Sequence, residues 1–232
     1  MFDIAYQPAK IPQVPIEPSN MLQSYHPTLF KRAMIDNTCT DEQRAVIARA
    51  AANCRTLAQF GASAAKTDKE RVLKYFKTSN PRSISTIVKT YENAYRECDI
   101  SRGENIITCH DGIHGCDDEI SDYRVSYTIA HTHANQNKIT ICPFFFQLPA
   151  TASIYKERSQ ANALLHEVTH LRSVKGTEDY SSRGHRDIME LTESQNLNHA
   201  DTYAYFVEAA RLKSPIVDVD DPKDPEDPMS CT

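Results

Sequence analysis

Hydrophobic residues recur at helical spacing through most of the chain and alternate with polar residues in one region. The helical pattern is clearest between residues 83 and 98, where apolar side chains repeat every three or four positions. Thr40 precedes an acidic pair and an alanine-rich run, an order typical of an N-cap followed by a helix. The pattern predicts helices over residues 41–65, 69–76, 83–98, 159–171, 186–196 and 199–213.

The alternating pattern runs from residue 124 to residue 146. Val125, Tyr127 and Ile129 alternate with polar residues, residues 134–137 are turn-forming, and residues 138–142 alternate again. Alternation on both sides of a turn predicts a β-hairpin. We therefore expect an α+β fold that is mainly α-helical, with a small antiparallel sheet built on this hairpin.

Proline marks both ends of the chain and divides it into three parts. Five of the twelve prolines lie in the first 27 residues and four in the last 18. We expect a proline-rich arm over residues 1–32, one folded domain over 33–213 and an acidic tail over 214–232. The tail is too polar to offset the entropy of the chain, so we expect it to be disordered. The dibasic pair Lys31-Arg32, at the junction of arm and domain, fits a propeptide cleavage site as well as a chance pair of exposed residues.

The bulk composition excludes some classes of partner. The chain has 232 residues, a net charge of −5 and 40% hydrophobic residues, which suits one domain with a real core. It lacks the clustered basic surface of nucleic-acid-binding proteins, and no apolar run is long enough to span a bilayer. We expect neither a nucleic-acid partner nor a membrane.

Seven scattered cysteines indicate disulfides rather than a cysteine-rich zinc site, because no C-x-x-C pair occurs. Disulfides imply an oxidising compartment. Residues 1–10 lack the apolar core of a signal peptide, so secretion implies a leader that was removed before residue 1. The alternative is a cytosolic protein with buried thiols.

The strongest chemical signal is HEVTH at residues 166–170, an H-E-x-x-H motif. Residues four positions apart project from one face of a helix, so His166 and His170 can bind one zinc ion and Glu167 can act on metal-bound water. The alternative is a surface helix that carries this cluster by chance. A catalytic zinc needs a third protein ligand and an open position for water. A turn at Gly176 would bring Asp179 back to the metal.

Together these motifs resemble the deuterolysin, or aspzincin, metallopeptidases, which pair H-E-x-x-H with G-T-x-D. This chain has HEVTH and then GTED, at residues 176–179, at the family's spacing. Residues 198–204, NHADTYA, resemble the family's N-x-A-D-T-Y-A segment on the last helix. Residues 139–145, ITICPFF, resemble the strand before the active helix. The resemblance covers residues 38–213, and several features recur in a divergent branch of secreted fungal avirulence proteases.

The resemblance implies a zincin-like domain in which the hairpin lies beside the H-E-x-x-H helix and one zinc ion is bound per chain. His166, His170 and Asp179 would be the ligands, with Glu167 as the general base. Asp201 would orient a ligating imidazole and lend negative charge to the substrate pocket. The implied protein is a secreted, monomeric endopeptidase acting on protein or peptide substrates.

One departure from the family concerns the tyrosine that stabilises the oxyanion, where this chain has Ser182. Tyr180 and Tyr203 are the nearest tyrosines, and Tyr180 would substitute if the loop follows a different path. Loss of a positioned donor costs about 10²–10³ in rate. The rival hypothesis is therefore a secreted effector or binding protein that keeps the zinc with weak or no catalysis. The intact Glu167 favours the active enzyme, because a purely structural site has no use for a base.

The family pattern also implies two disulfides. Of the three cysteines that remain, two lie on expected helices and form a natural third pair, and one near the C-terminus is left over. The expected pairs are Cys39–Cys109, Cys116–Cys142 and Cys54–Cys98, with Cys231 left over.

Two further histidine pairs carry weaker signals. His110 and His114 lie in a loop between cysteines, where solvated histidines are commoner than a second metal site. His131 and His133 share one face of a predicted hairpin strand. We expect them to line a surface, either an ordinary one or the substrate groove.

Overall fold

The computed structural model describes residues 34–101, 103–109, 116, 119–121, 124–126, 128–180 and 185–215. All of them belong to one structural unit, Lys31–Thr232. Several predictions concern residues outside this described set, namely the N-terminal arm with Lys31-Arg32, most of the acidic tail, His110, His114, Ser182 and Cys231.

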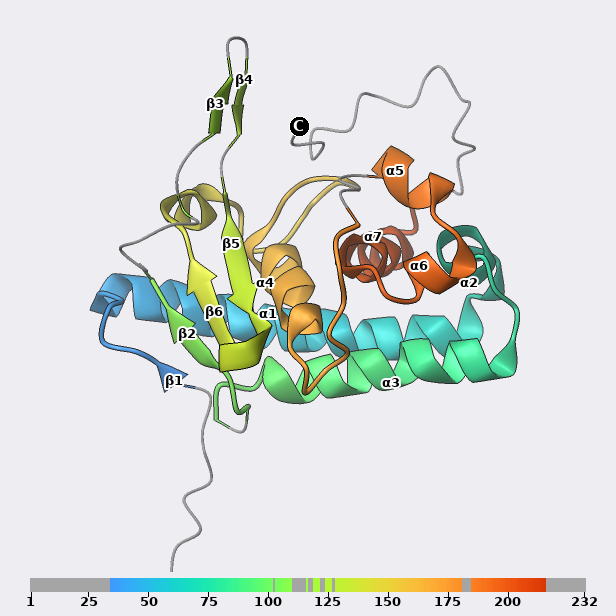
Figure 1. Ribbon diagram of the computed structural model, residues 1–232, viewed down its shortest axis with the longest axis horizontal. Helices are drawn as coiled ribbons and strands as arrows, with labels where there is room; N and C mark the ends of the chain where they lie inside the picture. The colour runs from blue at the N-terminus through green and yellow to red at the C-terminus, as the bar shows by residue number, and fades with distance from the viewer. Residues whose placement is uncertain are drawn as a thin grey trace, which may run out of the picture. The chain divides into compact units, whose positions relative to one another are not determined.

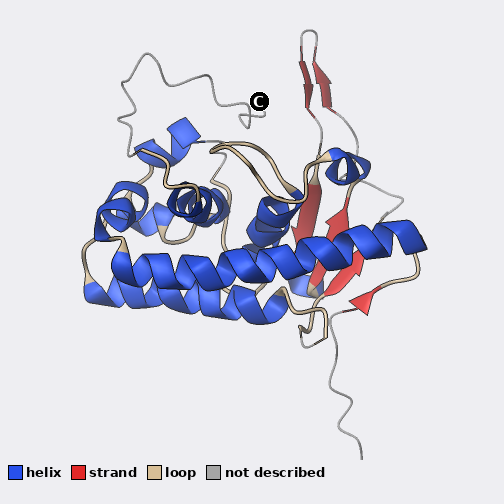
Figure 2. Cartoon of the chain, turned by 180° about the vertical axis from the view of Figure 1, so that it is seen from behind, coloured by secondary structure: helices blue, strands red, loops and turns tan. Residues whose placement is uncertain are grey.

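Three helices form the first half of the fold. Each begins at a capping side chain: Thr40 forms a capping box with Gln43, while Asp68 and Asn80 each accept a backbone hydrogen bond from the first turn that follows. The first and third helices run side by side in both ribbon views (Figures 1 and 2). Their bounds are α1 Asp41–Thr67, α2 Lys69–Phe76 and α3 Pro81–Glu97, close to those predicted.

The second half of the fold contains four more helices among the described residues. The single helix predicted over residues 186–196 is instead two short ones. Thr192 adopts an extended conformation, which ends the first of the two. Its side chain caps the second by accepting a hydrogen bond from the Gln195 amide. The bounds are α4 Gln160–His170, α5 His185–Glu190, α6 Glu193–Asn196 and α7 Ala200–Arg211.

The main sheet has four strands in the order β1-β2-β6-β5. The predicted hairpin is confirmed as the antiparallel pair β5–β6, but the sheet is mixed, because β1–β2 and β2–β6 are parallel. Residues 124–126 do not extend β5, as the alternation suggested, but pair with residues 119–121 in a separate two-stranded ladder. The bounds are β1 Met34–Ile35, β2 Ile106–Thr108, β3 Glu119–Ser121, β4 Arg124–Ser126, β5 Ala130–His133 and β6 Lys138–Ile141.

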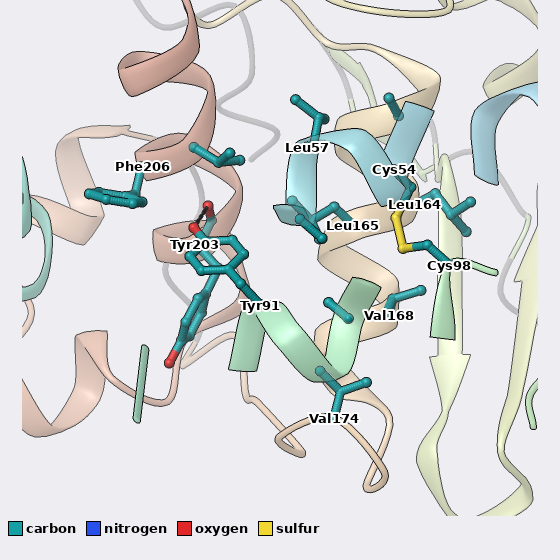
Figure 3. Close-up of a cluster of buried hydrophobic side chains, with 14 of the residues drawn as sticks. Cys54, Leu57, Tyr91, Cys98, Leu164, Leu165, Val168, Val174, Tyr203 and Phe206 are labelled. Carbon is teal, nitrogen blue, oxygen red and sulfur yellow. Dashed lines mark hydrogen bonds between the residues drawn. A yellow bond between two sulfur atoms is a disulfide. The ribbon is translucent and has the colours of Figure 1, made fainter. Parts of the chain in front are cut away.

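The core lies between α1, α3, α4 and α7, and Figure 3 shows the apolar side chains of α4 pointing into it. Leu164, Leu165 and Val168 of α4 are almost fully buried. A Cβ atom on Gly61 would lie 2.6 Å from the ring of Tyr91, so only glycine allows α1 and α3 to approach this closely. Burial of one face of α4 leaves its other face directed towards β5, which lies beside it (Figure 1).

Three disulfides confirm the expected pairing, and each closes a long loop. The paired cysteines lie 70, 44 and 26 residues apart in sequence. Because closed loops of this size restrict the unfolded chain, each disulfide stabilises the fold by about 3–5 kcal/mol. The pairs are Cys39–Cys109, Cys54–Cys98 and Cys116–Cys142. Within the described segments, none of the helices is both long and apolar enough to cross a membrane.

Candidate metal centre

Three side chains with metal-binding atoms converge at the exposed face of α4. The Nε2 atoms of His166 and His170 are 3.1 Å apart. Oδ1 of Asp179 lies 3.5 Å from the first nitrogen and 3.4 Å from the second. Ligands on a tetrahedral zinc with bonds of about 2.0–2.1 Å are separated by about 3.3 Å. The separations of the three atoms therefore fit three corners of a tetrahedron around a zinc ion.

The loop after α4 brings Asp179 back to the helix. Gly176 has φ +69°, a left-handed conformation that favours glycine. The amides of Gly176 and Thr177 both donate to the carbonyl oxygen of Thr169, 3.1 and 3.2 Å away. Backbone hydrogen bonds between Glu178 and the segment before α7 then fix the end of the loop. The turn predicted at Gly176 thus has its structural basis in the end of α4.

Both ligand imidazoles are oriented through their Nδ1 atoms. Nδ1 of His170 lies 2.7 Å from the carbonyl oxygen of Thr177, and Nδ1 of His166 lies 2.7 Å from Oδ1 of Asp201. Each contact suits an Nδ1–H donor, so Nε2 is the nitrogen that would bind a metal once it has lost its proton. Asp201 therefore contacts the imidazole of one candidate ligand, on the side away from the other two.

The electrostatics of the centre favour a cation. Burial opposes charging of His166, but the charge and hydrogen bond of Asp201 outweigh it and raise the pKa of this imidazole to about 10. Burial likewise opposes ionisation of Asp179, yet the hydrogen bond from His170 and the nearby imidazoles lower the pKa of its carboxyl. The pKa of Asp201 is also lowered, because His166 outweighs the effect of its burial. In the metal-free protein, the ionised carboxylates of Asp179 and Asp201 thus flank the imidazole of His166.

Glu167 is 7% exposed, and a threonine from the neighbouring strand holds it. Oγ1 of Thr132 on β5 lies 2.8 Å from Oε2 of Glu167 and 2.8 Å from its carbonyl oxygen. The hydroxyl has one proton, so it serves one acceptor at a time or shares the proton between them. Sequence reasoning did not identify Thr132, although the strand alternation places it on the face opposite His131 and His133.

A second residue that sequence reasoning did not identify is His199, the N-cap position of α7. It is fully buried, and its Nε2 lies 3.0 Å from the carbonyl oxygen of Asp179. Its Nδ1 lies 3.1 Å from Oγ1 of Thr202. His199 therefore holds the backbone of the candidate third ligand. The only sequence signal was its place inside the NHADTYA segment.

The two candidate tyrosines lie in different environments. Tyr180 has φ +48° and is 41% exposed, and its hydroxyl accepts a hydrogen bond of 2.9 Å from Nδ2 of Asn198. Tyr203 of α7 is fully buried, and its hydroxyl donates a hydrogen bond to the carbonyl oxygen of Leu197. Burial raises the pKa of this hydroxyl to about 12. Tyr203 is therefore a core residue and does not line the cleft, whereas Tyr180 adjoins a candidate ligand.

A cleft runs along α4 between β5 and the loop at residues 176–179. It is lined by the candidate ligands and by Glu167, Asp201 and Thr132, with Arg158 and Arg172 contributing positive charge. This arrangement combines a metal position, a candidate base and space for an extended ligand.

Comparison of the chain with known proteins finds a matching family. The aspzincin family model, described as lysine-specific metallo-endopeptidase, matches residues 61–208. A neutral protease 2 homolog from Pyricularia oryzae is 37% identical over 196 residues, which cover 84% of this chain and 53% of that protein. A neutral protease 2 homolog from Colletotrichum graminicola is 33% identical over 184 residues, covering 78% and 50%. The chain spans about half the length of the curated relatives it matches.

The fold has a counterpart among solved structures. A zinc peptidase from Grifola frondosa superposes with a TM-score of 0.58 at 22% identity, covering 75% of this chain and 98% of that one. At this identity the likeness establishes a shared fold.

Proposed function

Since this chain belongs to the aspzincin family of metallo-endopeptidases, we propose that it is a zinc-dependent endopeptidase that binds one zinc ion through His166, His170 and Asp179. The observation that carries the proposal is the mutual separation of the three ligand atoms, 3.1–3.5 Å. Coordinated zinc supplies a Lewis acid that polarises the scissile carbonyl and lowers the pKa of water towards about 7.

In this proposal Glu167 moves the protons of the reaction. Its carboxylate takes a proton from the attacking water while the water oxygen bonds to the carbonyl carbon. The same carboxyl then gives the proton to the nitrogen as the C–N bond breaks. Thr132 of β5 donates a hydrogen bond to Oε2 of Glu167, which limits the directions in which the carboxylate can point.

The substrate backbone would lie along β5. This strand is at the end of the sheet order, so its outer edge carries backbone groups that an extended peptide can pair with. The cleft that holds the metal ligands is bounded by the same strand. Pairing along β5 would place a peptide bond beside Glu167.

Tyr180 is the proposed donor to the developing oxyanion. It directly follows Asp179 in the chain, and its hydroxyl, which accepts a hydrogen bond from Asn198, keeps its own proton for donation.

A secreted effector or binding protein with weak catalysis is the second candidate function, which the serine at position 182 favours.

We further propose that the protein acts outside the cell as a monomer. Three disulfides among the described residues require an oxidising compartment to form and persist. The dibasic pair Lys31-Arg32 would be the site where the arm is removed, and N-terminal sequencing of secreted material should then find Ala33 first. A start at Met1 or Phe2 would contradict this.

The function is tested by casein digestion with and without a zinc chelator, alongside elemental analysis. We expect one zinc per chain, activity lost with the chelator and restored by zinc, and a Glu167→Ala variant that keeps the metal but does not hydrolyse casein. Glu190→Ala, which removes an exposed carboxylate, is the matched control. A zinc-loaded protein with no hydrolysis would favour the binding protein. Full activity in Glu167→Ala would assign the base elsewhere.

A further inference from the structure

A second pair of histidines has nearly the same mutual geometry as the candidate zinc ligands. His131 and His133 lie two positions apart on β5 and so project from one face of the strand. Their Nε2 atoms are 2.9 Å apart, with ring centroids 4.7 Å apart and ring planes at 80°. The corresponding values for His166 and His170 are 3.1 Å, 4.8 Å and 78°. We infer that His131 and His133 form a second metal site, which binds a divalent transition metal through their two Nε2 atoms.

The two imidazole nitrogens indicate which metal binds most tightly. With metal–nitrogen bonds of about 2.0 Å, two ligands lie about 2.8 Å apart in neighbouring square-planar positions and about 3.3 Å apart in a tetrahedron. The observed 2.9 Å lies within this range, so the pair fits either geometry. Affinities of nitrogen sites for first-row divalent ions peak at copper. Cu²⁺ is therefore the ion that this pair binds most tightly, with Zn²⁺ weaker and water completing the coordination.

The surroundings of the pair hold it in place. Both histidines are opposite residues of β6 in the antiparallel ladder, His131 facing Thr140 and His133 facing Lys138. The Cys116–Cys142 disulfide lies against His131, with both sulfurs within 4.8 Å of one of its ring nitrogens. Both imidazoles are half-buried, so they are fixed by packing yet still reachable by an ion. A pair fixed in this way loses little conformational freedom when a metal binds.

The pair shares no ligand with the candidate catalytic centre, but it lies on the strand that supports that centre, and His131 lines the same cleft. Thr132, between the two histidines, projects to the other face and contacts Glu167. An ion on the pair and an ion on α4 would therefore lie on opposite faces of β5. The proposal does not depend on peptidase activity, since binding can be measured without any substrate.

The test uses the full chain loaded with one equivalent of Zn²⁺ and titrated with copper(II) chloride. Electron paramagnetic resonance reports nitrogen ligands on the copper, and a zinc indicator reports any release of zinc. We expect the first equivalent of Cu²⁺ to bind with two imidazole nitrogens and without release of zinc. Loss of an outer partner alone costs about 10–100-fold in metal affinity, so His131→Gln and His133→Gln should each weaken copper binding by about tenfold or more. The double variant should lose little further affinity.

The control variant is His26→Gln, which removes one imidazole from the N-terminal arm and should leave copper affinity unchanged. Circular dichroism of each variant checks that the fold is kept. Copper that displaces zinc one for one, or binds His133→Gln as tightly as the parent, would overturn the proposal. So would copper binding seen only after reduction of the disulfides, because the thiols would then be the ligands.

Discussion

Nδ1 of His166 lies 2.7 Å from Oδ1 of Asp201, so α7 orients the imidazole that α4 presents at the candidate metal site. The carboxylate is largely buried, and its negative charge also raises the basicity of the ring. This contact joins two helices of the candidate site, the H-E-x-x-H helix and the last helix of the described chain.

Replacement of this carboxylate should weaken zinc binding. Asp201→Asn keeps an acceptor oxygen for Nδ1 but removes the charge, so zinc affinity should fall by about 10–100-fold. Competition with a chromophoric chelator measures the affinity. Glu190→Gln, an exposed carboxylate, should bind zinc like the parent protein. If Asp201→Asn retains the parent affinity, Asp201 does not support the ligand.

Thr132 should affect catalysis without affecting the metal. Thr132→Val keeps the shape of the side chain but removes the hydrogen bond to Glu167. A hydrogen bond to a charged group contributes about 1.5–3 kcal/mol, so kcat should fall by about tenfold or more, with zinc content and KM unchanged. Thr56→Val, on the exposed surface of α1, is the control. A parallel loss of zinc would show that Thr132 supports the metal site instead of the base.

Zinc binding should release protons at neutral pH. The pKa of His166 in the metal-free protein is raised to about 10, above its ordinary value of 6.5, so the ring is protonated at pH 7. Only neutral imidazole binds a metal. Zinc affinity should therefore increase by about tenfold per pH unit between pH 7 and about pH 10 for each proton displaced. Calorimetry in buffers of different ionisation enthalpy counts the protons, and a count near zero would contradict the charged state of His166.

Tyr180 should matter for the rate and not for binding. If its hydroxyl stabilises the oxyanion, Tyr180→Phe should lower kcat by about 10²–10³ while zinc content and KM stay unchanged. The control is Tyr95→Phe, which removes a hydroxyl that accepts a hydrogen bond from Arg55 and does not line the cleft. A Tyr180→Phe enzyme with the parent kcat would leave the contact with Asn198 as the only role of this hydroxyl.

Cleavage should favour, without requiring, Lys or Arg directly after the cut bond. Asp201 supplies negative charge at the cleft, but part of that charge is taken up by its contact with His166. Ala204, three positions later in the chain, adds no further negative charge. Arg158 and Arg172 line the same cleft and limit the preference. Mass mapping of cleavage sites in a peptide library measures it. Large apolar residues at this position, with no enrichment in Lys or Arg, would leave Asp201 as an orienting residue alone.

The sequence by itself determined most helices, the hairpin and the candidate ligands. These features depend on local signals: the cap at Thr40, the repeat of apolar residues, and the four-residue spacing of His166 and His170. Helix geometry alone places residues at that spacing on one face. Disulfide pairing came from resemblance to a family, because spacing of cysteines does not fix connectivity.

Tertiary structure decided what each candidate residue touches. The parallel pairing of β2 with β6, the contact of Thr132 with Glu167 and the contact of His199 with Asp179 join segments 20 to 35 residues apart or on separate elements. The same holds for Tyr203, a candidate oxyanion donor by sequence, whose ring is buried in the core against Tyr91 of α3. Such contacts depend on which face of each helix is buried and how strands are ordered, and those choices minimise exposed apolar surface over the whole domain rather than within any local segment.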